Sequence, residues 1–193
     1  MKKILLVTCL IFSLLSPSFC KAEFQDSARV LGYSGIAFVG TLLIHESGHY
    51  VALKYLFPQD VNNVHIHFDT WPAKVSYYDH GLGTGKENFI HLSGFIFTRS
   101  AAETIDASNL NSKFASFIYL FTRFDMPRYV LSSALKQFID YPHPGGDVHS
   151  VIKSWAPNEN NQILIYTSLL TAMIVDIYFD RKEIKKHLSR IFF

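Results

Sequence analysis

The sequence is poor in cysteine, and the few cysteines it has lie near its start. Cys9 and Cys20 are the two cysteines among 193 residues. Both belong to a stretch with adjacent lysines, the apolar run "ILLVTCLIFSLL" and small residues around Ala22, which is typical of a secretory signal peptide spanning residues 1–22. The mature domain, residues 23–193, is then expected to fold without disulfides, thiolate metal ligands or a cysteine nucleophile. An uncleaved anchor helix is the alternative interpretation.

A surplus of positive charge is also absent from the expected mature chain. Cleavage would remove Lys2, Lys3 and Lys21, which lowers the basic residues from 18 to 15 against 16 acidic ones. Nothing in this balance indicates nucleic-acid binding. Apolar residues make up 49% and charged residues 18% of the chain, with a mean hydropathy of +0.14, so composition admits both a soluble and a membrane protein. The length suits one domain.

Long apolar segments recur along the chain. Residues 28–57 form one nearly uncharged run that ends before Pro58 and exceeds the roughly 20 residues needed to cross a bilayer. We expect further crossings at 113–135 and 162–180, with 89–105 dipping into the membrane or lying on it. The basic residues of the last segment predict a cytoplasmic C-terminal tail. An exported N-terminus would then require an odd number of crossings, and three are predicted.

One segment departs from the helical pattern. Alternating and β-branched residues between Val61 and Tyr78, with a break at "DTWPAK", predict a β-hairpin. Loops are predicted for the glycine-rich "DHGLGTGKEN" and for Asp140 to Ser150, which is rich in proline and glycine. The predicted fold is mainly α: a small polytopic membrane helix bundle with a short β-hairpin after the helix of residues 28–57.

Three ionisable side chains interrupt the first apolar helix. His45, Glu46 and His49 form an HExxH motif. Residues four apart project from the same face of an α-helix, so the two imidazoles can bind one Zn²⁺ at about 2.1 Å. Glu46 would reach zinc-bound water and act as general base in hydrolysis. The alternative is a pair of core histidines that hydrogen-bond to their neighbours.

A zinc site of this kind needs a third protein ligand. The segment "HPGGDVH" provides Asp147, which we predict as that ligand because two preceding glycines would let a loop bring the carboxylate close to a helix. His149 is the second choice, and an ordinary turn or helix N-cap is the alternative role for Asp147. His65 and His67, two apart on a predicted strand, form either a separate metal pair or a polar hairpin face.

The motif "HESGHYVALKYLF" resembles the active-site helix of the site-2 protease class of membrane metallopeptidases, the M50 family. The resemblance implies that His45 and His49 bind zinc, that Glu46 is catalytic and that Asp147 completes the metal site. It also implies that the hairpin of residues 61–78 holds an extended substrate by strand addition.

Two polar residues precede the next predicted helix. Asn88 and His91, in "ENFIHLSG", are candidates for polarising a scissile carbonyl, and helix capping is their alternative role.

The leading hypothesis is therefore a zinc metalloprotease of the bacterial inner membrane. It would cleave a membrane protein or peptide in or near the lipid bilayer, with Glu46 assisting the attack of zinc-bound water. One alternative is a soluble or peripheral exported zinc hydrolase. The other is a non-catalytic membrane binding or scaffold protein whose HExxH motif is structural or degenerate.

Overall fold

The protein is mainly helical in the computed structural model, which describes residues 24–69, 74–139 and 146–193. Seven α-helices and a two-stranded antiparallel hairpin confirm the mainly α prediction. The predicted signal peptide lies outside the described residues. The elements are α2 (Phe24–Val51), the π-helical turn η2 (Ala52–Leu56), β1 (Val61–His67), β2 (Lys74–Asp79), α3 (Thr84–Ala107), α4 (Lys113–Arg123), α5 (Asp125–Phe138), α6 (Asp147–Trp155), α7 (Glu159–Phe179) and α8 (Arg181–Phe192).

Two helical segments are long and apolar enough to cross a membrane. These are Arg29–Leu56, formed by α2 and η2, and Glu159–Phe179, which is α7. Both leave large apolar side chains exposed, since an apolar run without helical periodicity cannot bury every face against one core. The exposed apolar residues of these two segments are Leu31, Tyr33, Ile36, Val39, Leu43, Tyr55, Leu56, Ile163, Leu164, Ile174, Val175, Tyr178 and Phe179.

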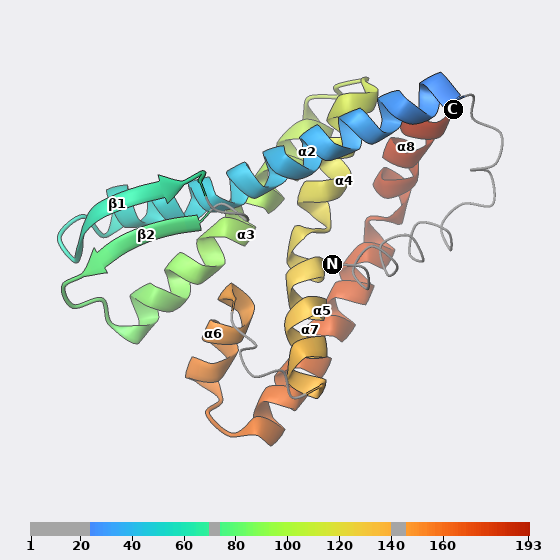
Figure 1. Cartoon of the computed structure of the whole chain (residues 1–193). Coiled ribbons are helices and arrows are strands. Elements are labelled where there is room, and N and C mark those ends of the chain that lie inside the picture. The colour runs from blue at the N-terminus through green and yellow to red at the C-terminus, as the bar shows by residue number, and fades with distance from the viewer. Residues whose placement is uncertain (1–23, 70–73, 140–145) are drawn as a thin grey trace.

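The third predicted crossing is not one continuous helix. Residues 113–135 are divided at Phe124 between α4 and α5, each shorter than a membrane span. Pro127 explains the division, because a proline has no N–H to donate to the carbonyl four residues earlier, here that of Arg123, and its ring crowds that carbonyl. The two helices still follow one another along one column (Figure 1). The prediction of a single spanning helix here is wrong.

The β-hairpin forms where it was predicted. Val61 pairs with Asp79 and Ile66 pairs with Val75, with an irregularity in the register between Asn62 and His65. Figure 1 shows the hairpin alongside the C-terminal part of α2. It therefore lies next to the part of α2 that carries the HExxH motif.

The predicted loops are shorter in the structure because helices begin earlier. α3 starts at Thr84, inside the predicted glycine-rich loop. The described part of the loop predicted for Asp140 to Ser150 ends at Gly146, whose φ of 113° is accessible to glycine. Asp147 then opens α6, and a carboxylate in the first turn of a helix is stabilised by the helix dipole.

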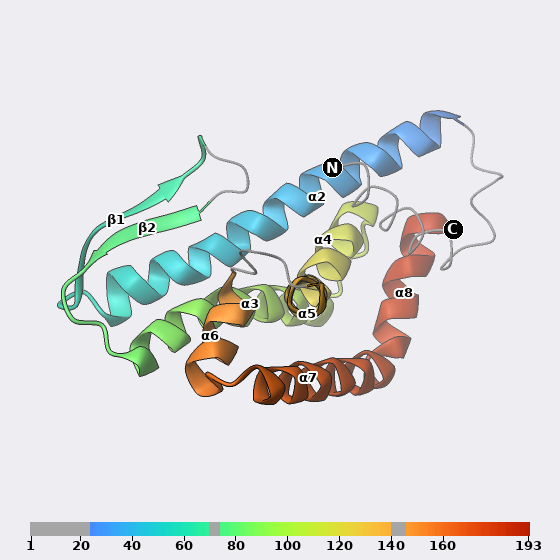
Figure 2. The ribbon, with the colours of Figure 1, turned by 60° about the horizontal axis from the view of Figure 1, so that its bottom comes forward.

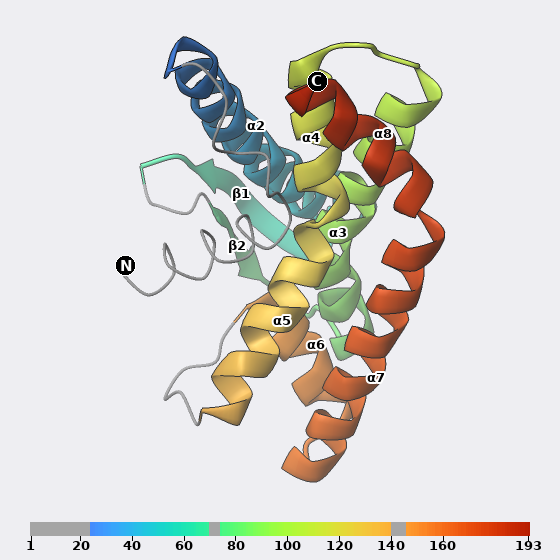
Figure 3. The same ribbon diagram turned by 90° about the vertical axis from the view of Figure 1, so that its right-hand side faces the viewer.

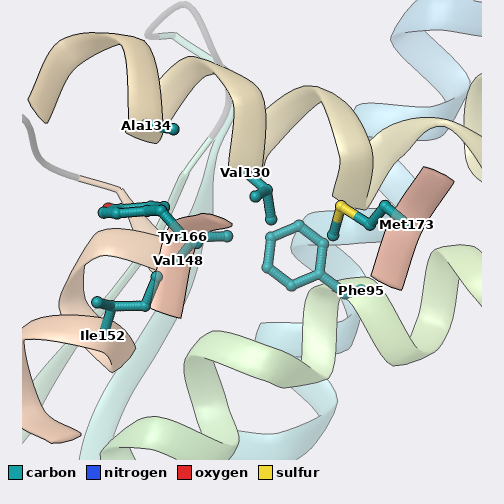
Figure 4. Packing of buried hydrophobic residues seen from close by; sticks show 7 residues of the cluster. All are labelled: Phe95, Val130, Ala134, Val148, Ile152, Tyr166 and Met173. Carbon is teal, nitrogen blue, oxygen red and sulfur yellow. The ribbon is translucent and has the colours of Figure 1, made fainter. Parts of the chain in front are cut away.

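A buried cluster fixes α6 against three other helices. Phe95 of α3, Val130 of α5, Ile152 of α6 and Tyr166 of α7 belong to this cluster, which Figure 4 shows in close view. In Figure 2, α6 accordingly lies between α3 and α7. The cluster sets the position of the first residue of α6, Asp147.

The start of α2 and helix α8 lie at the same end of the molecule. Ala37 of α2 packs with Phe117 of α4 and Ile191 of α8, and Val30 adds to the same cluster. Figure 3 shows α8 beside α4. The predicted exported N-terminus and cytoplasmic tail would put these two segments on opposite sides of a membrane. The sides of the membrane on which they lie remain a prediction.

Candidate metal centre

Three potential metal ligands converge from two helices. His45 and His49 project from α2, and Asp147, which is 102 residues from His45, projects from the first turn of α6. Oδ2 of Asp147 lies 3.2 Å from Nε2 of His45 and 3.3 Å from Nε2 of His49. The three ligand atoms all lie within 4.8 Å of one another. We call these residues the metal triad, and together they could hold a metal ion.

Two of the three separations within the metal triad fit tetrahedral zinc. Zinc binds imidazole nitrogen and carboxylate oxygen at about 2.0–2.2 Å, so two ligand atoms at the tetrahedral angle lie about 3.3–3.5 Å apart. The two separations from the Asp147 oxygen are 3.2 and 3.3 Å. The three ligand atoms could therefore hold an ion between them.

The opposite ring nitrogens of both histidines are already occupied. Nδ1 of His45 donates to Oδ2 of Asp125 at 2.7 Å, and Nδ1 of His49 donates to the carbonyl oxygen of Ile90 at 2.6 Å. A neutral imidazole that donates from Nδ1 presents the lone pair of Nε2. These two hydrogen bonds thus orient both Nε2 atoms as ligands, which is the usual arrangement around metal-binding histidines.

His91 holds the other oxygen of Asp147. Its Nδ1 donates to Oδ1 at 2.8 Å, while Oδ2 faces the two HExxH histidines. Burial by itself raises the pKa of the Asp147 carboxyl, but the facing imidazoles of His45, His49 and His91 outweigh this and hold the pKa well below its usual range. Asp147 is therefore a carboxylate with one oxygen directed to the metal position.

Two glycines let α2 and α3 approach closely at the metal triad. A Cβ at Gly48 would overlap the Ser93 carbonyl, and a Cβ at Gly94 would lie 2.5 Å from Nε2 of His45. Any larger residue at either position would push the helices apart or displace the His45 ring. Glycine is thus required at both positions by the close contacts around the site, and not by the backbone conformation.

Aromatic rings complete the wall around His45. Tyr129 of α5 stacks on its imidazole with ring centroids 4.9 Å apart, and Phe95 meets it edge-on at 4.7 Å. The His45 side chain is fully buried as a result. A low-polarity surrounding strengthens electrostatic interactions within a metal site.

Glu46 lies beside the metal triad and contacts the hairpin. Its side chain is nearly buried, with 9% of the residue exposed. Oε2 accepts a hydrogen bond of 3.1 Å from the backbone N–H of Val75 in β2. The carboxylate is therefore positioned between the metal triad and one edge of the hairpin.

The other predicted site residues have different positions. Asn88 is buried, and its Oδ1 accepts from the Ser154 hydroxyl at 2.9 Å, which joins α3 to α6. His149 lies 3.1 Å from the Tyr166 hydroxyl and is not part of the metal triad. His67 is bound to Ser76 on the hairpin. Within residues 24–69, 74–139 and 146–193, the metal triad is the one group of three or more such ligands close enough to share an ion.

Sequence analysis did not find Asp125 or the Ile90 carbonyl. Asp125 is a charge within an apolar segment, and such a charge needs a partner when it is buried. That was a usable signal, but the partner is 80 residues away in the chain. The role of the Ile90 backbone carbonyl cannot be predicted from side-chain identities.

Comparisons of the chain with protein-family models, with curated proteins and with solved structures found no match. The function therefore has to be inferred from the site itself.

Proposed function

We propose that the protein is a zinc-dependent endopeptidase that works in or at a membrane. The observation that carries this proposal is the position of Oδ2 of Asp147, 3.2 and 3.3 Å from the two HExxH imidazoles. Two histidines and one carboxylate leave the fourth position of a tetrahedral ion open, which distinguishes catalytic zinc sites from closed structural ones.

The chain supplies the proton transfers around such an ion. Zinc, when bound, acts as a Lewis acid toward water and toward the substrate carbonyl. Glu46 accepts the proton of the attacking water and passes it to the nitrogen of the leaving amine as the peptide bond breaks. His91 holds Asp147 in place through Oδ1.

A membrane location follows from the exposed apolar surface of α2 and α7. Both helices are long and apolar enough to cross a bilayer. Large side chains such as Leu31, at 73% exposure, and Ile174, at 68%, would face water in a soluble protein. The substrate would then be a membrane protein or a peptide held at the bilayer.

Substrate binding by strand addition uses β2. This strand has β1 on one side, while its other side is turned to Glu46. An extended peptide that joins this outer edge in place of Glu46 would lie next to the metal triad.

Hydrolysis of fluorescently labelled casein by the purified full chain in detergent tests this function. We expect zinc-dependent cleavage by the wild type, which a chelator removes. Glu46→Gln should keep zinc and lose about 10²- to 10⁴-fold in rate, the range for general-base catalysis. Glu103→Gln, remote from the site in α3, is the matched control and should cleave normally. Full activity of Glu46→Gln would overturn the proposed mechanism.

A further inference from the structure

The backbone N–H of Val75 points away from its own hairpin. Val75 is paired in register with Ile66 of β1, yet its N–H donates to Glu46. In an antiparallel ladder, alternate residues direct their N–H groups toward the partner strand and away from it. The N–H of Val75 therefore belongs to the outer edge of β2, and Glu46 covers it.

The outer edge is held in place by apolar packing. Val75 packs against a buried cluster that includes Leu53 of η2 and Ile90 of α3. The carbonyl of Ile90 in turn receives the hydrogen bond from His49. The edge of β2 and the metal triad thus both contact α3 at Ile90.

Glu46 and a strand-adding peptide need the same donor. A peptide that pairs with the outer edge must offer a carbonyl oxygen to the N–H of Val75. That N–H is already engaged by Oε2 of Glu46 at 3.1 Å. One N–H cannot make two strong hydrogen bonds at once, so the peptide must displace the carboxylate.

We propose that the Val75 amide is a specificity-determining group that is exchanged between Glu46 and the substrate backbone. An extended peptide takes the N–H, and this releases the Glu46 carboxylate to accept a proton from water. Peptides that cannot pair with β2 leave Glu46 bound to Val75 and are cleaved slowly. This inference rests on the proposed function and adds the selection of extended substrates to it.

Amide hydrogen exchange of the full-length protein in detergent micelles tests the resting hydrogen bond without any hydrolysis. Glu46→Ala removes the hydrogen bond between the Val75 N–H and a charged carboxylate. Exchange of the Val75 amide should therefore be about 10- to 100-fold faster in this variant. Glu46→Gln keeps an acceptor and should retain much of the protection. The amide of Ser76, which faces β1, is the internal control. Equal exchange of the Val75 amide in wild type and Glu46→Ala would overturn the proposal.

Peptide binding tests the exchange itself. The probe is a fluorescein-labelled, C-terminally amidated (Thr-Val)₃ peptide, which has a high preference for extended structure. Glu46→Ala should bind it about 2- to 10-fold more tightly than Glu46→Gln, since glutamine still competes for the N–H. Neither variant carries the general base, so cleavage does not interfere.

A third variant removes the donor. When Val75→Pro is combined with Glu46→Ala, it should abolish the tighter peptide binding expected for Glu46→Ala alone. Proline is tolerated at this position because the N–H it replaces faces away from the ladder. Equal affinity of Glu46→Ala and Glu46→Gln contradicts the exchange. These measurements need no catalysis. If they fail while casein is cleaved, the exchange is rejected and the protease function stands. If they succeed while casein is not cleaved, the protease function alone is rejected.

Discussion

Nδ1 of His45 lies 2.7 Å from Oδ2 of Asp125, and both side chains are fully buried. The second oxygen of Asp125 accepts from Arg128 at 2.8 Å. The carboxylate therefore fixes the His45 ring from α5, while the metal position lies on the other side of the ring. No ligand spacing in the sequence points to this contact, yet it decides which nitrogen of His45 faces the metal.

Asp125→Asn should weaken zinc binding about 10- to 100-fold, the usual effect of losing a carboxylate partner of a metal-binding histidine. The physical reason is that an amide orients the imidazole less firmly and does not increase its basicity. Competition titration of the full chain with a zinc indicator measures the change. Asp106→Asn, which removes a carboxylate that pairs with Lys186 far from the site, should leave the zinc affinity unaltered.

His91→Gln should weaken zinc binding and leave the protein folded. Loss of the 2.8 Å hydrogen bond to Oδ1 frees Asp147 to rotate, so its other oxygen is presented to the ion less often. We expect a reduction of about 10-fold or more in zinc affinity. His65→Gln, on the exposed part of β1, is the matched control. An unchanged affinity in His91→Gln would show that Asp147 is held by other contacts.

Gly48→Ala should destabilise the protein, whereas Gly40→Ala on the same helix should not. A Cβ at Gly48 overlaps the Ser93 carbonyl, while nothing lies within 4 Å of a Cβ at Gly40. Overpacking of this kind costs about 1–3 kcal/mol, and alanine in an open helical position contributes about 1 kcal/mol in its favour. Thermal unfolding in detergent should therefore shift in opposite directions. A parallel shift of the two variants would contradict the close approach of α2 and α3.

His187 gives the fold a pH dependence separate from the metal site. Its ring is buried and stacks on Tyr119 with centroids 3.9 Å apart, and Nε2 has no hydrogen-bond partner among the described residues. Burial lowers the pKa of His187, although the Asp106 carboxylate opposes this and nearby Arg190 and Lys186 add to the lowering. The folded protein thus disfavours the protonated ring.

The sign of the effect follows from this lowered pKa. An unfolded histidine takes up a proton near pH 6.5, and the folded one does so only at lower pH, so the stabilisation is present above about pH 6.5 and is lost as the pH falls. We expect the free energy of unfolding to fall by up to about 1.4 kcal/mol per pH unit in that window. His187→Phe should remove this part of the slope, whereas replacing the exposed His80 should preserve it. Identical slopes in wild type and His187→Phe would contradict the buried, neutral ring.

Local pattern was enough to predict the hairpin, α7 and the two HExxH histidines of the metal triad. Apolar runs and alternation depend on neighbouring residues, and the His45–His49 spacing depends on helical geometry alone. The metal triad also contains Asp147, the residue chosen from the glycine context of its segment. What the sequence did not reveal depends on contacts between distant segments: Asp125 beside His45, and Val75 beside Glu46.

One error had an identifiable physical cause. The break at Phe124 follows from Pro127, which was overlooked within an apolar segment. The packing of Ala37 with Ile191 is a tertiary contact between distant segments, which local sequence patterns do not contain.

The most direct test of the account is the zinc content of the purified full chain, measured by mass spectrometry for the wild type and for Asp147→Ala. The metal triad predicts one zinc per wild-type chain and its loss in the variant, because two imidazoles alone leave the ion without its third protein ligand. A wild-type chain without zinc, or an Asp147→Ala chain that retains it in full, would contradict the central claim.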